Sequence, residues 1–264
     1  MKIVGVDFTS APKRDKRITV AIGAYDGLLT VGDLVEFSDW PAYEQWLDAD
    51  DAWLGGFDFP FGLPRRFVDA QRWRGTWAQM VQDCVRGGKE RFVEIGMKAF
   101  VAASSNQDKH RATDLRAGSH SPLKTKTNPP VGKMFYEGAW RLLSRGIHIP
   151  VLNETGSAKI AVEAYPGLLA KRLGFNQYKN DKPANSRKNR DARATILQGL
   201  ASGAHPLGVT LSLGSALRRR ALTDVSGDTL DAILCAVQAA WASGQTRFGM
   251  PAEVDCCEGW IVSA

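Results

Sequence analysis

Cysteine and histidine are scarce in this chain of 264 residues, which contains four of each. Neither residue type falls at the spacing of a zinc motif, and no CxxC pair or disulfide framework is present. Long apolar runs are also missing, because the longest, 232–237 and 99–103, are far shorter than the ~20 residues of a membrane helix. These absences argue against a structural zinc site, a disulfide scaffold and a membrane-spanning chain.

The first residues, MKIVGVD, enter an apolar segment that ends in a carboxylate. They lack the long apolar stretch and the small-residue cleavage site of a signal peptide. With 44% hydrophobic and 23% charged residues, the composition predicts a globular protein of the cytoplasm that makes no membrane contact. The length suits a single domain over residues 1–264.

Acidic residues are outnumbered, with 28 Asp and Glu against 34 Lys and Arg, so the net charge is +6. Residues 171–193 hold eight basic and two acidic side chains, and residues 104–133 hold six basic and two acidic ones. Two such segments favour a nucleic-acid partner, DNA or RNA, over the alternative of a solvated helix face and a flexible loop. The side chains expected to bind this substrate are Lys124, Lys126, Lys133, Arg187, Lys188 and Arg190.

Hydrophobic periodicity predicts an α/β fold. Three β-branched segments open the chain, and Asp26-Gly27 between the second and third is a strong hairpin signal. A short helix and a buried strand follow, so the expected opening order is βββαβ. The expected strands are 3–6, 17–25, 28–37, 52–57, 147–152 and 159–165. The expected later helices are 166–173, 186–200, 211–222 and a last one capped by Ser226 that runs to Trp241.

Residues 64–150 are expected to form a helical insertion or cap between the fourth and fifth strands of the sheet. Apolar residues at spacings of three and four run from 65 to 103, and the whole segment is far longer than an ordinary loop. Its basic loop, residues 124–133, is expected to gate substrate access. The alternative is a surface excursion with no role in binding.

Three acidic residues interrupt apolar strand sequences near their carboxyl ends: Asp7, Asp58 and Glu163. A carboxylate there is costly unless it meets donors or a cation, and ligands collect beyond the carboxyl ends of parallel strands. If the strands of Asp7 and Asp58 are parallel neighbours about 4.8 Å apart, both carboxylates reach one ion. The alternatives are an Asx-type turn at Asp58 and a buried ion pair at Glu163.

The last predicted helix supplies a second pair, because Asp228 and Asp231 are three residues apart and share one face of its first turn. The alternative is that these acids only complement the helix dipole. Carboxylates that converge without a cation repel one another and stay partly protonated, so convergence with Asp7 and Asp58 predicts a bound metal ion.

Oxygen ligands without a nearby imidazole or thiolate favour Mg²⁺ or Mn²⁺. Two such ions ~4 Å apart position a water and stabilise the leaving oxygen in the hydrolysis of a phosphodiester. The predicted catalytic residues are Asp7, Asp58, Asp228, Asp231 and Glu163. All of these except Glu163 are also predicted metal ligands.

Four motifs carry a resemblance to a known family: GVDFTSAP at 5–12, GFDFPFG at 56–62, EAYP at 163–166 and DTLDA at 228–232. They resemble domain-of-unknown-function family 429, whose members are predicted to be ribonuclease-H-like nucleases. The order of elements is similar to the RuvC-type resolvases of the ribonuclease H superfamily.

The resemblance implies a mixed five-stranded sheet in the order 3-2-1-4-5, with its first three strands antiparallel and helices flanking it. It places Asp7 on the central strand, Asp58 on the fourth strand, and Asp228 and Asp231 on the late helix as metal ligands. Glu163 matches the family motif but no standard ligand of the superfamily. The implied activity is a nuclease that uses divalent metal ions.

Two other functions remain open at this point. A small-molecule phosphotransferase of the actin and sugar-kinase fold also opens with a strand and hairpin, but Phe8 stands where glycine lets the backbone approach a phosphate. A scaffold that binds nucleic acid or protein without catalysis would retain the same fold. ATP binding would favour the first, and failure to bind Mn²⁺ would favour the second.

Overall fold

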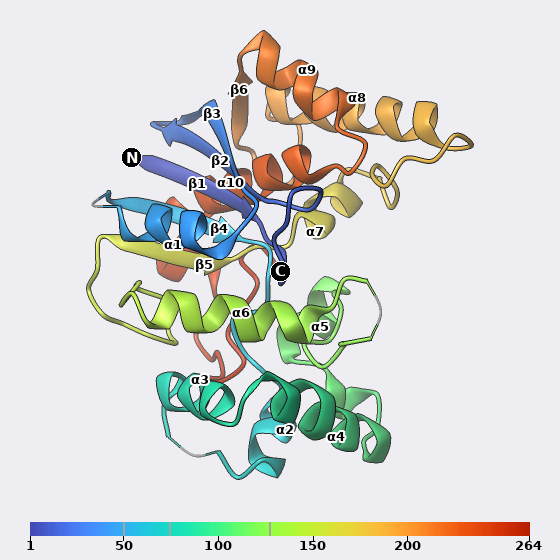
Figure 1. The fold of residues 1–264 in the computed structure, drawn as a ribbon. Coiled ribbons are helices and arrows are strands. Elements are labelled where there is room, and N and C mark those ends of the chain that lie inside the picture. Colours follow the sequence, from blue (N-terminus) through green and yellow to red (C-terminus); the bar gives the residue numbers. More distant parts are fainter. Residues whose placement is uncertain (50, 74, 127) are drawn as a thin grey trace.

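The computed structural model describes residues 1–49, 51–73, 75–126 and 128–264. At its centre is a mixed sheet of six strands in the spatial order β5-β4-β1-β2-β3-β6, with helices on both faces (Figure 1). The predicted α/β class with flanking helices is therefore confirmed. The strands are β1 (Lys2–Asp7), β2 (Ile18–Tyr25), β3 (Leu28–Phe37), β4 (Trp53–Phe57), β5 (Lys159–Glu163) and β6 (Thr210–Leu213).

The predicted order 3-2-1-4-5 is wrong, because β6 extends the sheet beyond β3 and pairs with it in parallel. β6 overlaps the start of the segment 211–222, which was predicted to be one helix. Its two leucines alternate with Thr210 and Ser212, as in a strand, and Gly214 separates it from helix α9 (Ser215–Thr223). A run of four residues is too short for periodicity to distinguish a strand from a helix, and the open edge of β3 decides the outcome.

Three parallel strands end at one edge of the sheet. β1 pairs in parallel with β4, where Val6 lies opposite Phe57, and β4 pairs in parallel with β5, where Phe57 lies opposite Glu163. On its other side β1 is antiparallel to β2. The carboxyl ends of β1, β4 and β5 therefore meet, and they carry the first three acids that the sequence singled out.

Hydrophobic cores lie on both faces of the sheet because side chains alternate along its strands. Val4 and Val6 of β1 belong to the core that includes Tyr43 and Leu47 of helix α1 (Trp40–Asp48). Ile3 belongs to the other core, which includes most of helix α10 (Asp228–Ser243). The central strand β1 is therefore covered on both sides, and packing on both faces positions Asp7 at its end.

The chain between β4 and β5 is largely helical, and in Figure 1 helix α6 lies next to the sheet with α2, α3 and α4 beyond it. The segment 147–152, predicted as a strand, contains only isolated bridges, such as His148 with Ile160. Thr127 of the expected gating loop lies outside the described residues. The helices are α2 (Arg65–Ala70), α3 (Trp77–Arg86), the π-helix η1 (Glu90–Gly96), α4 (Met97–Ala103), the 3-10 helix η2 (Gln107–Lys109), α5 (Ala112–Ala117) and α6 (Val131–Leu143).

The remaining helices follow β5. They are α7 (Pro166–Arg172), α8 (Ser186–Ser202), α9, α10 and the 3-10 helix η3 (Thr246–Gly249). In Figure 1, α8 and α9 lie together at the β6 end of the sheet, far from the helices between β4 and β5. Within the part of the chain that the structure describes, no helix has the length and apolar character needed to span a membrane.

Candidate functional site

Asp7 and Asp58 stand side by side where β1 and β4 end. The amide of Asp58 donates to the carbonyl oxygen of Val6 at 2.9 Å, so the parallel pairing continues to the two acids. The sequence predicted that the two carboxylates would lie close together if these strands were parallel neighbours. That pairing is confirmed.

Asp231 reaches the same edge because α10 packs directly on the backbones of β1 and β4. A Cβ atom at Gly5 would lie 2.0 Å from the carbonyl oxygen of Ala232, and one at Gly56 would lie 2.4 Å from that of Cys235. Only glycine leaves room for so close an approach. This close packing places the first turn of α10, which carries the fully buried Asp231, against the ends of β1 and β4.

The three carboxylates form a compact group, which we call the acidic triad: Asp7, Asp58 and Asp231. One oxygen from each can be chosen so that all three lie within 4.8 Å of one another. Three carboxylate oxygens at this spacing fit a hard divalent cation such as Mg²⁺ or Mn²⁺. The structure thus brings together three of the four metal ligands predicted from the sequence.

Two acids of the triad, Asp7 and Asp58, have raised pKa values. Burial raises the pKa of Asp7 well above its ordinary value, and the carboxylates of Asp228, Asp231 and Asp58 raise it further. Burial also raises the pKa of Asp58 to about 7, although the nearby Lys179 ammonium opposes the shift. A divalent ion would neutralise these groups and displace their protons, so the charge of the site suits metal binding.

Two side chains that the sequence did not mark as functional hold Asp231. The Tyr178 hydroxyl donates to its Oδ1 at 2.6 Å, and the Lys179 ammonium donates to its Oδ2. Burial opposes the charge of Lys179, but the carboxylates of Asp231, Asp7 and Asp58 outweigh it and raise the pKa of the lysine. The sequence placed Lys179 in a basic segment, but no pattern distinguished it from the seven other basic residues there.

Asp228, the fourth predicted ligand, lies at the start of α10 outside the triad. It is half-buried, and burial raises its pKa. The expected cap by Ser226 is wrong, because the N-cap residue is Gly227 and makes no side-chain bond. The carboxylate of Asp224 instead accepts from the amides of Ser226, Gly227 and Thr229 at 3.0, 3.3 and 2.8 Å.

Glu163, predicted to be catalytic, forms a buried ion pair. Arg111 donates to its two carboxylate oxygens at 2.8 and 2.6 Å, and the amide of Phe61 donates to Oε2 at 2.9 Å. Arg111 also binds Asp114, and all three charged side chains are almost fully buried. The structure therefore favours the ion-pair alternative for Glu163 and does not bring it into the triad.

Replacing Arg111 with Met should destabilise the protein by ~3–5 kcal/mol, because two buried carboxylates lose their shared cation. Urea unfolding at pH 7 measures the loss. Arg187 is exposed on α8, so Arg187→Met is a matched control and should change the free energy of unfolding by less than ~0.5 kcal/mol. A loss below ~1 kcal/mol for Arg111→Met, the level of a surface pair, would contradict this structural role.

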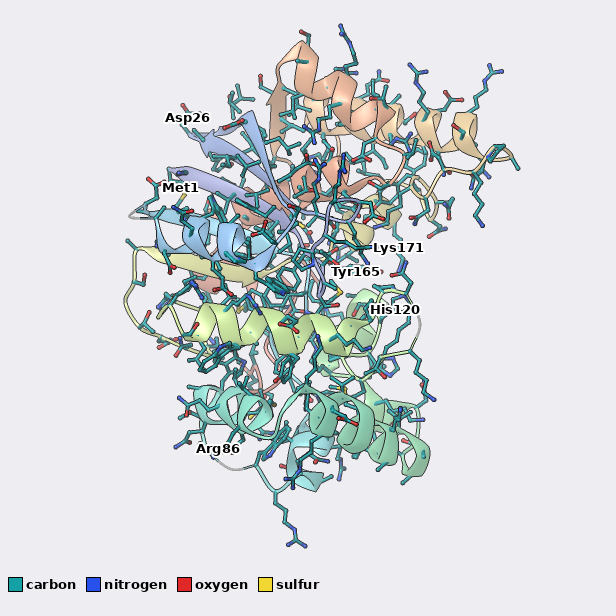
Figure 2. The ribbon with its side chains drawn as sticks, viewed as in Figure 1. Met1, Asp26, Arg86, His120, Tyr165 and Lys171 are labelled. Atoms are coloured by element: carbon teal, nitrogen blue, oxygen red, sulfur yellow. The ribbon has the colours of Figure 1, made fainter. Side chains whose placement is uncertain are left out.

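A cavity of about 350 Å³ opens beside the triad, and Asp7, Asp58 and Lys179 line it. Both basic segments contribute to its wall, as does the loop after β1. Figure 2 shows Tyr165 and Lys171 close to His120, and Lys171 Nζ donates to Tyr165 Oη at 3.3 Å. The other lining residues include Lys16, Arg17, Arg111, Asp114, Ser119, Asn128, Pro129, Pro130, Phe175, Asn176, Asn180 and Asp228.

The six side chains expected to bind substrate lie outside the described lining of this cavity: Lys124, Lys126, Lys133, Arg187, Lys188 and Arg190. The Lys124 ammonium donates to the carbonyl oxygen of Asn128 at 3.2 Å, so it braces the loop that forms the wall. The three residues from α8 are exposed. Their contact with a polyanion stays a prediction, while the basic side chains that line the cavity itself include Lys16, Arg17 and Lys171.

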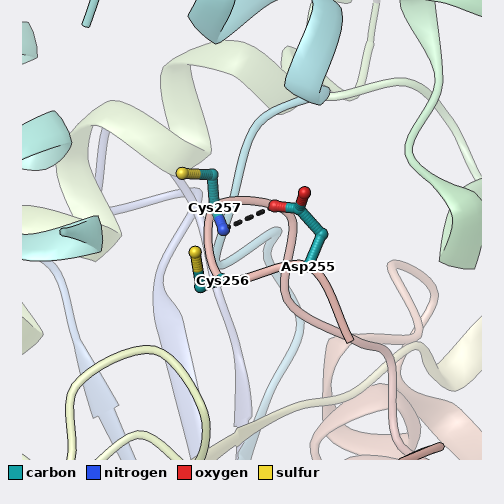
Figure 3. Close-up of side chains that lie close together, drawn as sticks. All are labelled: Asp255, Cys256 and Cys257. Carbon is teal, nitrogen blue, oxygen red and sulfur yellow. Dashed lines mark hydrogen bonds between the residues drawn. The ribbon is translucent and has the colours of Figure 1, made fainter. Parts of the chain in front are cut away.

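A second group of ligand atoms comes from Asp255, Cys256 and Cys257 (Figure 3). The carboxylate of Asp255 already accepts two bonds from the Arg65 guanidinium, at 2.8 and 2.7 Å. It also accepts from the amide of Cys257 at 2.7 Å, the contact drawn in Figure 3. Because its oxygens are engaged in an ion pair and a turn, we assign this group a structural role.

The fold and the site define a mixed α/β protein with an acidic triad at the carboxyl edge of its parallel strands. The family described as protein of unknown function (DUF429) matches residues 5–254, and the chain belongs to that family. The family that the four motifs resembled is thereby confirmed. No curated protein and no solved structure matches the chain significantly.

Proposed function

We propose that this protein is a nuclease that hydrolyses phosphodiester bonds of DNA or RNA with the help of Mg²⁺ or Mn²⁺. One observation carries the proposal: the carboxylates of Asp7, Asp58 and Asp231, from two strands and a helix, come within 4.8 Å of one another. Buried acids that repel one another destabilise a fold, so an arrangement that gathers three of them is best explained by a bound cation.

The same arrangement supports a ribonuclease-H-like fold. Strands β1 to β3 form an antiparallel unit that β4 and β5 continue in parallel, and α10 crosses the central strands. The acids on β1, after β4 and on α10 stand where the resemblance placed the metal ligands of that superfamily. The sixth strand at the β3 edge is an addition that leaves this part of the sheet unchanged.

Each part of the cavity has a role in this proposal. The triad would hold the metal ion, which supplies Lewis-acid stabilisation of the charge that develops at phosphorus and its oxygens. Lys16, Arg17 and Lys171 on the wall would attract the phosphates of a nucleic acid. The part of the wall that comes from the segment between β4 and β5, with Asn128 and Pro129, would limit how a nucleic-acid strand enters the cavity. It would also exclude water from the bound phosphate.

The direct test incubates the purified full chain with end-labelled single-stranded DNA, duplex DNA and RNA. We expect cleavage of at least one of these substrates with Mn²⁺ or Mg²⁺, and no cleavage when EDTA removes the metal. The reason is that the carboxyl groups of the triad supply no positive charge to stabilise the negative charge of the transition state. Gel electrophoresis of the products measures the rate. A protein that binds Mn²⁺ and nucleic acid but cleaves none of the substrates would be a binding scaffold, against this proposal.

A further inference from the structure

Lys179 brings a positive charge of the chain itself into the acidic triad. Its ammonium bonds Oδ2 of Asp231, a carboxylate of which 1% is exposed, and it interacts electrostatically with Asp7 and Asp58. Tyr178 occupies the other oxygen of Asp231. One of the three acids thus has a cationic partner, while Asp7 and Asp58 face the cavity beside it.

The backbone that carries Lys179 is fixed from two sides. The Asn189 side chain donates to the carbonyl oxygen of Lys179 at 3.0 Å, and the buried Arg193 donates to that of Tyr178 at 2.8 Å. Against α10, a Cβ at Gly227 would lie 2.5 Å from the Cβ of Lys179. Lysine is usually a flexible surface residue. Here the bonds to the backbone of residues 178 and 179 and the contact with Gly227 hold the lysine beside the triad.

The balance of charges limits how many metal ions the site accepts. One divalent ion and the Lys179 ammonium together match the three carboxylates of the triad. Two divalent ions with Lys179 would place five positive charges against four carboxylates even when the half-buried Asp228 is included. Like charges in a partly buried site repel strongly, so the second ion would have to displace the lysine.

We propose that Lys179 takes the place of a second metal ion: the site binds one divalent ion, and the ammonium supplies the other positive charge that faces the phosphate. The count of ions rests only on the triad, and the contact with phosphate rests on the proposed nuclease function. From the sequence, two ions were expected, one to position a water and one to stabilise the leaving oxygen of a phosphodiester. The structure adds a fixed cation that the sequence did not reveal.

Calorimetric titration with Mn²⁺ alone tests the count of ions at pH 8. We expect one Mn²⁺ per chain for the wild type and two for Lys179→Ala, the second bound more weakly than the first, because loss of the ammonium leaves uncompensated carboxylates. Lys182→Ala is the matched control, since Lys182 is exposed on the same segment, and it should bind one. Lys179→Arg keeps the charge and should also bind one, which separates loss of charge from misfolding.

The cleavage rate gives a second measurement. With Mn²⁺ at a concentration that saturates the wild type, Lys179→Ala should cleave about 100-fold more slowly, as expected when one charged group at a reacting oxygen is lost. Raising the Mn²⁺ concentration should restore its rate with a second-order dependence on the metal, whereas the wild type should show a first-order dependence. Lys179→Arg should retain most of the activity.

The outcomes separate the two proposals. Two ions in the wild type, or one in both the wild type and a folded Lys179→Ala variant, would overturn the role of Lys179 even if the wild type cleaves nucleic acid. The expected shift from one ion to two in a protein that cleaves nothing would support the role of Lys179 and overturn the nuclease function. Absence of Mn²⁺ binding in every form would overturn both.

Discussion

The Asp7→Asn variant should lose Mn²⁺ binding and nuclease activity while it becomes more stable in the absence of metal. Asp7 is the acid at the end of the central strand, and its neutral replacement removes both a ligand and a repelling charge. A bound metal supplies several kcal/mol at ~1.4 kcal/mol per tenfold in rate, so we expect cleavage to fall by about 1000-fold. In EDTA at pH 8 the free energy of unfolding should rise by at least ~1 kcal/mol, because each pKa unit of the strained acid corresponds to ~1.4 kcal/mol.

Calorimetric titration with Mn²⁺ and urea unfolding measure these two effects separately. Asp191 is exposed on α8, so Asp191→Asn removes the same charge without touching the triad and should match the wild type in both measurements. A variant that is simply misfolded would lose both binding and stability. Unchanged Mn²⁺ affinity in Asp7→Asn would contradict the candidate site.

The affinity for Mn²⁺ should fall steeply between pH 8 and pH 6. Asp58 has a pKa of about 7 in the metal-free protein, so it is ionised at pH 8 and protonated at pH 6. An ion that binds at pH 6 must first displace this proton, which costs about tenfold in affinity for one group with this pKa. Asp7, whose pKa is also raised, adds to the decrease.

The stability of the metal-free protein should also depend on the protonation of Asp7 and Asp58, and it should change with pH in one direction. Both acids have a higher pKa in the folded chain than in the unfolded chain, so between about pH 4 and pH 7 the folded state binds more protons. The free energy of unfolding in EDTA should therefore decrease as the pH rises through 7, and saturating Mn²⁺ should reverse the decrease. Asp58→Asn should reduce the slope. Equal Mn²⁺ affinity at pH 6 and pH 8 would be inconsistent with this mechanism.

The sequence predicted the part of the site that depends on regular secondary structure. Asp7 and Asp58 follow strands whose apolar character marks them as central, and parallel neighbours place their carboxyl ends together. Asp228 and Asp231 were predicted together, three residues apart in the first turn of a strongly apolar helix, and no pattern distinguished the one that joins the strand ends. The positions of Asp7 and Asp58 thus follow from periodicity and from the rules of sheet assembly, whereas the choice of Asp231 over Asp228 depends on how α10 packs.

The parts that depend on contacts between distant segments were not predicted. Arg111 and Glu163 are 52 residues apart, and no local pattern joins them, so the ion pair remained one alternative for Glu163. Lys179 lies 52 residues from Asp231. It differs from the neighbouring basic residues only through its tertiary contacts, such as the bond from Asn189 of α8 to its carbonyl oxygen. Strand β6 escaped notice because its identity is fixed by the edge of β3 and not by its own four residues.

The glycine contact between α10 and β1 fixes the centre of the site through backbone atoms. Any side chain larger than hydrogen at Gly5 would push the helix away, so the spacing of the acids is fixed by backbone atoms. Part of the cavity wall, by contrast, comes from the segments 104–133 and 171–193, which lie outside the sheet. Substitutions in these two segments can therefore change which molecules enter the cavity, while the positions of the three acids stay the same.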